Sequence, residues 1–168
     1  MKRHFVLDEN IVILAQKMED ESGHPDPACW ELLRAIEANC HSLVFTQAVW
    51  ERWMSQLSTL LRPRQKTFLT PNVLEIVQSL FTNAAKDSRF IQDDEVSSVD
   101  GLDDLPHVDI GDRDFVRAAA SVDRAVLVTS DGPLRAILND NGIPDRHSFL
   151  VCDSKSALPL AGPDEPES

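Results

Sequence analysis

Short apolar segments that alternate with helical segments constrain the fold of this chain more than any other feature. Four of them are typical of β-strands, at residues 5–7, 43–45, 125–128 and 149–151. Helical spacing of apolar residues or helix start signals mark six further segments, at residues 11–18, 30–40, 46–62, 72–85, 112–119 and 133–138. Strands separated by helices usually pair in parallel. The sequence therefore predicts an α/β fold, in which an open, mostly parallel, twisted sheet is flanked by helices.

One domain accommodates this pattern. The chain has 168 residues, of which 42% are hydrophobic, and this is enough apolar material for a single core. We expect the domain to span residues 1–158, with an acidic loop at about 92–111 and a disordered tail at 159–168. The first residues are too polar for a signal peptide, and no apolar stretch approaches the roughly 18–20 residues of a membrane span. A cytoplasmic protein without membrane contact is expected.

The net charge of −12 argues against a surface that coats nucleic acid broadly, because phosphates are repelled by such a field. Basic residues nevertheless gather in one part of the chain, called the basic segment below, which contains Arg52, Arg62, Arg64 and Lys66. The basic segment is a candidate track for a nucleic-acid substrate. It fits equally well an exposed helix end and turn with solvated charges.

Four acidic residues stand where a predicted strand gives way to a helix, or in the helix that follows: Asp8, Glu51, Asp112 and Asp131. Taken singly, each has a structural explanation, because a carboxylate at a helix start caps backbone N–H groups and suits the helix dipole. Asp112 is expected to be such an N-cap. Parallel α/β sheets, however, bind ligands at the carboxyl ends of their strands, where Asp8 and Asp131 close two apolar runs. Together the four acids indicate a divalent-metal site at that edge.

The acids also stand in four motifs that resemble those of PIN-domain nucleases. These are Asp8-Glu9-Asn10 after the first strand, residues 41–52 with a strand, Thr46 and a helix bearing Glu51, residues 112–119 with an acid at a helix start, and residues 125–134 with a strand ending in Thr129-Ser130-Asp131. Each motif is short, but all four follow the family's order and together cover residues 4–138. Their combination makes the resemblance fairly specific.

Converging carboxylates need a counter-charge, and Mg²⁺ or Mn²⁺ is the hard cation that oxygen ligands select. Asp8, Asp112 and Asp131 are the expected metal ligands, and Glu51 is expected to bind a second ion or to orient the attacking water. A bound dication supports phosphodiester hydrolysis, which makes these four acids the candidate catalytic residues. The residues expected to hold the carboxylates or a phosphate oxygen by hydrogen bonds are Asn10 and Thr129.

The resemblance implies an RNA substrate rather than DNA. Many small single-domain members of the family are toxins held inactive by a cognate protein, so a toxin–antitoxin role is one expectation. The partners to test are therefore an RNA, an inhibitor (antitoxin) protein and a second copy of the chain in a homo-oligomer.

Two features depart from the family's pattern. Glu9 stands where the family usually has a small hydroxylic residue, so an extra carboxylate would crowd or bind the metal. Asp109 and Asp114 flank Asp112 and compete for the third acidic role. Asp112 precedes the apolar helical face by the family's interval, which leaves Asp114 as the runner-up.

Three other readings share part of the pattern. A receiver domain would use Asp8-Glu9, Thr129 or Ser130, and Lys155, but it requires an Asp at the end of its central strand, and residues 43–49 contain none. A haloacid-dehalogenase-type phosphatase would have a second Asp two residues after its nucleophile, where this chain has Asn10. The third possibility is a PIN-like fold that serves as a binding module without turnover.

Overall fold

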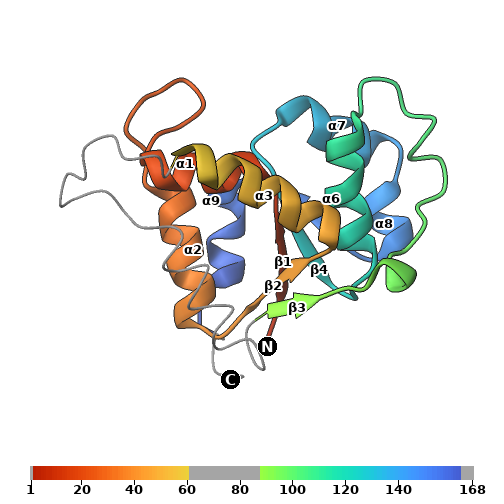
Figure 1. The fold of residues 1–168 in the computed structure, drawn as a ribbon, viewed down its shortest axis with the longest axis horizontal. Coiled ribbons are helices and arrows are strands. Elements are labelled where there is room, and N and C mark those ends of the chain that lie inside the picture. Colours follow the sequence, from red (N-terminus) through yellow and green to blue (C-terminus); the bar gives the residue numbers. More distant parts are fainter. Residues whose placement is uncertain (1, 61–87, 164–168) are drawn as a thin grey trace.

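A computed structural model of the protein describes residues 2–60 and 88–163. Within these residues five strands form one sheet in the order β3-β2-β1-β4-β5, and every pairing in it is parallel (Figure 1). The strands are β1 (His4–Leu7), β2 (Ser42–Phe45), β3 (Ser88–Phe90), β4 (Ala125–Val128) and β5 (Leu150–Cys152). The predicted α/β fold with a parallel sheet is confirmed.

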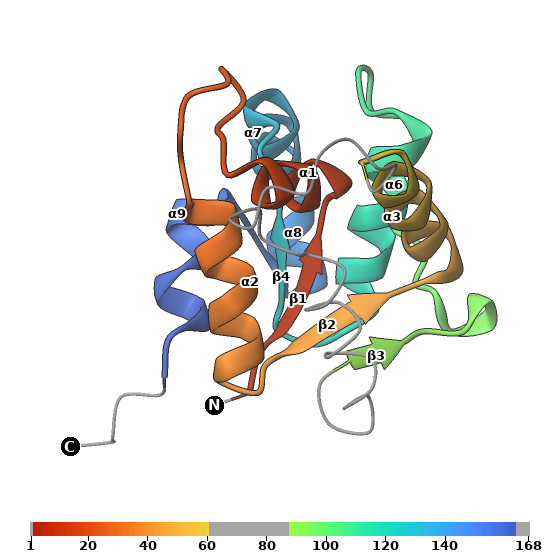
Figure 2. The same cartoon turned by 60° about the vertical axis from the view of Figure 1, so that its left-hand side comes forward.

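Helices cover both faces of the sheet. Within the described residues the α-helices are α1 (Glu9–Lys17), α2 (Ala28–Ala38), α3 (Gln47–Leu60), α6 (Ile110–Ala120), α7 (Gly132–Asp140), α8 (Ile143–His147) and α9 (Ser154–Ala157). α2 and α9 lie on one side of the sheet, and α6 and α8 lie on the other (Figure 1, Figure 2). None of the described helices is both long and apolar enough to cross a membrane.

The direction in which successive strands are added to the sheet reverses between β1 and β4. β2 and β3 extend the sheet from one edge of β1, whereas β4 and β5 extend it from the other. β1 and β4 pair in register up to Leu7 opposite Val128, and the Asp8 backbone N–H donates to the Val128 carbonyl at 3.0 Å. Open α/β sheets bind ligands in the crevice at such a reversal. Asp8 and Thr129, the residues that follow the two strands, stand at this crevice.

Trp53 fixes α3 to the carboxyl end of β1. Its buried ring packs edge-on against Phe45, with ring centroids 4.8 Å apart. Its indole N–H donates to the Leu7 carbonyl at 2.8 Å. At the start of the same helix, Thr46 Oγ1 accepts the Val49 backbone N–H at 3.2 Å, so Thr46 caps α3. The α3 segment that contains Glu51 and Arg52 is thus anchored beside the candidate site.

The start of α6 differs from the prediction. The helix begins at Ile110, and its N-cap is Asp109, whose Oδ1 accepts the Asp112 backbone N–H at 2.8 Å. Asp112 is therefore not the N-cap but lies within the first turn. Two Asp residues three positions apart both fit a cap pattern, and the sequence could not distinguish them. The correction leaves the Asp112 side chain available for another role.

The acidic loop at 92–111 is anchored to the core. Val99, Leu102 and Val108 are buried, and the loop contains the short 3-10 helix η1 (Asp93–Glu95). Strand β3, just before the loop, was not expected because Ser-Arg-Phe has no apolar run. Both features arise from contacts with distant segments, which local periodicity does not reveal.

The end of the chain is more ordered than its composition suggested. Pro159–Ala161 form the 3-10 helix η2, Ala161 is buried, and the Asn39 side-chain amide donates to the Ala161 carbonyl at 2.8 Å. The predicted disorder was wrong for residues 159–163, because these contacts hold a segment whose Pro and Gly content is typical of a tail. The remaining tail, at 164–168, and the helix predicted at 72–85 lie outside the described residues.

Candidate functional site

Asp8 and Thr129 form the centre of the candidate site. Asp8 is 3% exposed, and Thr129 is fully buried. The Thr129 hydroxyl donates to Asp8 Oδ2 at 2.6 Å, and Asp8 Oδ1 accepts the Asn10 backbone N–H at 3.0 Å. Both carboxylate oxygens are held, so this side chain has a fixed orientation. The hydrogen bond expected of Thr129 is present, whereas Asn10 contributes its backbone and leaves its side chain exposed.

Asp131 and Asp112 approach Asp8 from two other elements. Asp131 caps α7, where its Oδ1 accepts a backbone N–H at 2.8 Å, and its own N–H donates to Thr129 Oγ1 at 3.2 Å. Burial, followed by the charges of Asp109, Asp8 and Asp131, raises the pKa of Asp112 from an ordinary 3.8 to about 6. The three predicted metal ligands thus lie within electrostatic range of one another, in a place where carboxylates repel.

The acids that flank Asp112 have other partners. Asp109 caps α6. Asp114, the runner-up for the third acidic role, has its Oδ2 3.5 Å from Arg52 Nε and its Oδ1 3.8 Å from Arg117 Nη1. An acid between two guanidinium groups already has its counter-charge. The geometry therefore favours Asp112 over Asp114 as the partner of Asp8 and Asp131.

Glu9, the departure from the family's pattern, belongs to the same group of acids. This group is called the acidic edge below and comprises Asp8, Glu9, Asp109, Asp112, Asp114 and Asp131. Its Oε1 lies 3.7 Å from Arg52 Nη1, and its side chain is 21% exposed. Its Oε2 is buried and has no hydrogen-bond partner in the described part of the chain. Burial and the neighbouring Asp8 raise the pKa of Glu9 from an ordinary 4.5 to about 7, although Arg52 opposes this effect. Glu9 thus adds a further carboxylate beside Asp8.

The surroundings of Glu51 and Arg52 differ from those that the sequence predicted. Glu51 is exposed and accepts a hydrogen bond from Gln47 Nε2 at 2.7 Å, and it is not among the main charges that act on Asp112. The structure therefore does not bring Glu51 into the group of Asp8, Asp112 and Asp131. Arg52 is 35% exposed and is engaged with Glu9 and Asp114. The rest of the basic segment, which comprises Arg62, Arg64 and Lys66, lies outside the described residues.

The acids supply suitable donors for a hard cation, but they do not surround one as they stand. Among residues 2–60 and 88–163, no three His, Cys, Asp or Glu side chains form a group that could hold a metal ion. The donor chemistry fits Mg²⁺ or Mn²⁺, because every candidate ligand is a carboxylate. The unpartnered Glu9 Oε2 and the raised pKa of Asp112 fit a site that lacks positive charge. Coordination would require these side chains to turn toward one another.

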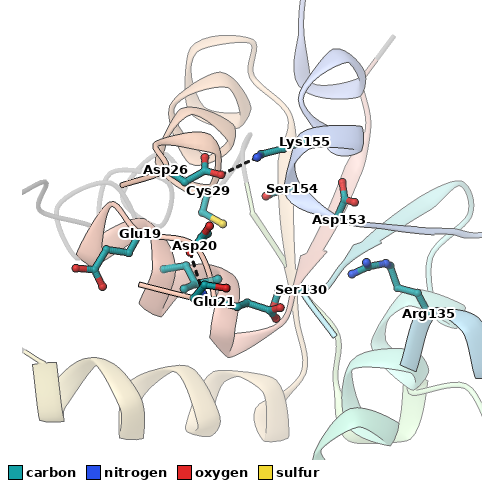
Figure 3. A pocket seen from close by; sticks show the side chains of 12 residues that line it. Glu19, Asp20, Glu21, Asp26, Cys29, Ser130, Arg135, Asp153, Ser154 and Lys155 are labelled. Carbon is teal, nitrogen blue, oxygen red and sulfur yellow. Dashed lines mark hydrogen bonds and ion pairs between the residues drawn. The ribbon is translucent and has the colours of Figure 1, made fainter. Parts of the chain in front are cut away.

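A pocket of about 260 Å³ opens at the carboxyl ends of β4 and β5 (Figure 3). It reaches the candidate acids only at Ser130, the residue before Asp131, and five acids of its own line it: Glu19, Asp20, Glu21, Asp26 and Asp153. Arg135 of α7 points into it, and its Nη1 donates to the Thr129 carbonyl at 2.6 Å. On another wall, Lys155 Nζ lies 2.7 Å from Asp26 Oδ2. Only Ser130 and Lys155 of this pocket were noted in the sequence analysis, because its walls come from distant segments, mainly residues 19–29, 130–135 and 153–155.

Comparisons with protein-family models and with curated proteins find no match for this chain. The resemblance to PIN-domain nucleases accordingly remains a hypothesis that rests on the four short motifs. The site itself offers a chemical argument that does not depend on it: crowded carboxylates at the crevice of a parallel sheet, beside a pocket that contains an arginine.

Proposed function

We propose that the protein is a metal-dependent endoribonuclease that hydrolyses RNA phosphodiester bonds with Mg²⁺ or Mn²⁺. One observation carries the proposal. Asp8, Asp112 and Asp131, which belong to three separate elements, lie within electrostatic range of one another where the strand order reverses. The reaction and the RNA substrate come from the resemblance of the four motifs to PIN-domain nucleases.

In this proposal Asp8, Asp112 and Asp131 hold the cation, and Thr129 orients Asp8 for that role. When bound, the cation supplies an acidified water molecule and stabilises negative charge on the phosphoryl group. Asp8 is already fixed by two hydrogen bonds, so Asp112 and Asp131 would turn toward it. Their mutual repulsion opposes this movement unless a dication offsets it.

The substrate would approach over the pocket at the carboxyl ends of β4 and β5. Arg135 lies between this pocket and Thr129, and it would give a phosphate of the RNA chain a cationic partner. Glu51, which is exposed on α3, would act outside the inner group by binding a second ion or by orienting the water. Arg62, Arg64 and Lys66 keep their predicted role as a substrate track.

A PIN-like binding module without turnover is the second candidate. The lack of a ready metal group among the described residues favours it. A receiver domain gains no such support, because the sheet order is β3-β2-β1-β4-β5 and not the 2-1-3-4-5 of receiver folds.

The biological setting follows from the resemblance alone. We propose action in the cytoplasm, together with inhibition by a cognate antitoxin protein, and a homo-oligomer as the alternative partner. Expression of the chain should arrest growth, and a small protein encoded by a neighbouring gene should relieve the arrest. Unimpaired growth at high expression of active protein would argue against the toxin role.

The test of the enzymatic proposal is RNA cleavage in Mn²⁺. Asp8→Asn and Asp131→Asn should each abolish cleavage, because they keep the side-chain shape and remove the charge that holds a dication. Thr129→Val should reduce cleavage about 10–100-fold by releasing Asp8. Asp140→Asn, the same substitution at the exposed end of α7, is the matched control and should cleave normally. Retained Mn²⁺-dependent cleavage in Asp8→Asn or Asp131→Asn would exclude this metal centre.

A further inference from the structure

Arg52 joins three helices at the acidic edge. It belongs to α3, its Nη1 lies 3.7 Å from Glu9 Oε1 on α1, and its Nε lies 3.5 Å from Asp114 Oδ2 on α6. Guanidinium groups are suited to such bridging, because their planar fork presents several N–H donors at fixed angles. The helices themselves also touch, since α3 packs against both α1 and α6.

The guanidinium of Arg52 rests on α6 at a glycine. A Cβ atom placed on Gly111 would overlap the Cζ and both Nη atoms of Arg52. Gly111 is buried, and it is the second residue of α6. Any other residue at this position would push the guanidinium away from the helix. Because Gly111 has no side chain, the Arg52 guanidinium can lie directly against α6 at this position.

Two of the three residues that Arg52 contacts, Glu9 and Gly111, directly adjoin a candidate metal ligand. Glu9 directly follows Asp8, and Gly111 directly precedes Asp112. The next residue of α3, Trp53, donates to the carbonyl of Leu7, which directly precedes Asp8. The position of Arg52 is therefore coupled through single peptide units to Asp8, the N-cap of α1, and to Asp112 in the first turn of α6.

We propose that Arg52 is a positioning residue, whose guanidinium, seated on Gly111, fixes α1 and α6 on α3 and thereby sets the spacing between Asp8 and Asp112. The role replaces the RNA contact expected from the sequence. It rests on the proposed function for the use of that spacing, which is to bind a divalent cation.

Positioning and simple charge predict opposite effects on metal binding. If Arg52 acted only as a nearby positive charge, its removal would tighten the binding of a cation, because like charges repel. If Arg52 positions the acids, its removal separates them and weakens binding despite the lost repulsion. The direction of the change in Mn²⁺ affinity therefore distinguishes the two roles.

Two variants remove the contact between the Arg52 guanidinium and α6 in different ways. Arg52→Met removes the guanidinium, and Gly111→Ala displaces it while every charge is kept. Arg34→Met is the control for the first, since Arg34 is an exposed arginine of α2 whose Nη1 lies 3.8 Å from Glu37 Oε2. Gly132→Ala is the control for the second, because Gly132 also lies in a first helical turn beside a candidate ligand, and a Cβ there would make an ordinary contact with Arg135 Nη2, at 3.7 Å.

Calorimetric titration of the full chain with Mn²⁺ should show about 10-fold weaker binding in Arg52→Met and in Gly111→Ala, the size expected when a residue that orients metal ligands is lost. Both controls should bind Mn²⁺ like the wild type. Arg52→Lys should recover only part of the affinity, because an ammonium lacks the bridging fork. Equal or tighter binding in Arg52→Met, or Gly111→Ala that behaves like Gly132→Ala, would overturn the proposal.

Unfolding in urea without metal tests the positioning role of Arg52 independently of the proposed metal-dependent function. Gly111→Ala should destabilise the protein relative to Gly132→Ala, and it should cease to do so in the Arg52→Met background, where nothing remains to be displaced. If the wild type binds no Mn²⁺, the proposed function fails. This double-mutant cycle then tests by itself whether Arg52 holds α6 at Gly111. Additive effects of the two substitutions would show that it does not.

Discussion

At the scale of single residues, the acidic edge contains two kinds of carboxylate. Asp109 and Asp114 have partners: Asp109 accepts a hydrogen bond from a backbone N–H, and Asp114 forms ion pairs with two guanidinium groups. Asp112 and Glu9 are less well matched, and burial together with neighbouring acids raises the pKa of both. Unmatched buried charge costs stability, and such groups cluster at functional sites because binding or catalysis uses them. The contrast directs attention to Asp112 rather than to its neighbours.

Asparagine substitutions test this contrast. Asp112→Asn should abolish Mn²⁺-dependent RNA cleavage and leave stability without metal unchanged or higher at pH 7, because it removes a repelled charge. Asp114→Asn should cleave less than the wild type, because it loosens Arg52, but should remain clearly active, and it should lose roughly 1 kcal/mol of stability, since it breaks partly exposed ion pairs with Arg52 and Arg117. Cleavage assays and urea unfolding of both variants give the answer. The reverse pattern would assign the third acidic role to Asp114.

The pH dependence of stability follows from the same acids. The pKa of Asp112 rises from 3.8 to about 6 on folding, and that of Glu9 rises from 4.5 to about 7. The folded state then binds protons more tightly than the unfolded state, so stability contributed below about pH 4 is lost as the pH rises toward 7. Urea unfolding from pH 4 to 8 without metal should show a smaller decline in Asp112→Asn and Glu9→Gln than in the wild type. Parallel curves for all three proteins would contradict the raised pKa values.

At the scale of secondary-structure elements, the sequence indicated those parts of the fold that local patterns encode. β1 and β4 are apolar runs that end in Asp8 and just before Asp131, so their order and the polar edge could be predicted. β3 has only Ser-Arg-Phe, and its pairing with β2 decides its conformation. The contact between Arg52 and Gly111 brings together residues that are far apart in sequence, and no periodic pattern relates them. The acids of the site were predictable, but the contacts that arrange them were not.

The attachment of α3 to β1 gives a prediction at this scale. Trp53→Phe keeps a ring against Phe45 and removes the indole N–H that the Leu7 carbonyl accepts at 2.8 Å. The buried hydrogen bond should be worth about 1–3 kcal/mol in urea unfolding. Trp30→Phe in α2, where the ring is only partly buried, is the control and should cost less. An equal cost in both variants would mean that the hydrogen bond does not hold α3 in place.

At the scale of the whole molecule, the net charge of −12 and the acidic edge have the same physical consequence. The field disfavours the approach of RNA and favours the binding of cations, and the latter effect is strongest where burial lowers the local dielectric. A dication at Asp8, Asp112 and Asp131 would therefore stabilise the fold and reduce the repulsion of substrate. Metal binding would come before RNA binding on this view.

Melting curves test the coupling of metal to the whole fold. Millimolar Mn²⁺ or Mg²⁺ should raise the melting temperature by more than NaCl of equal ionic strength does, because a ligand that binds only the folded state stabilises it and a monovalent salt only screens charge. Asp8→Asn should lose the extra shift, and Asp140→Asn should keep it. If the wild type gives no shift beyond NaCl, the titration is repeated with a non-cleavable RNA, which adds phosphate oxygens to an incomplete ligand shell. A shift that appears only then would show that RNA completes the metal site, whereas no shift in either case would favour a binding module without turnover.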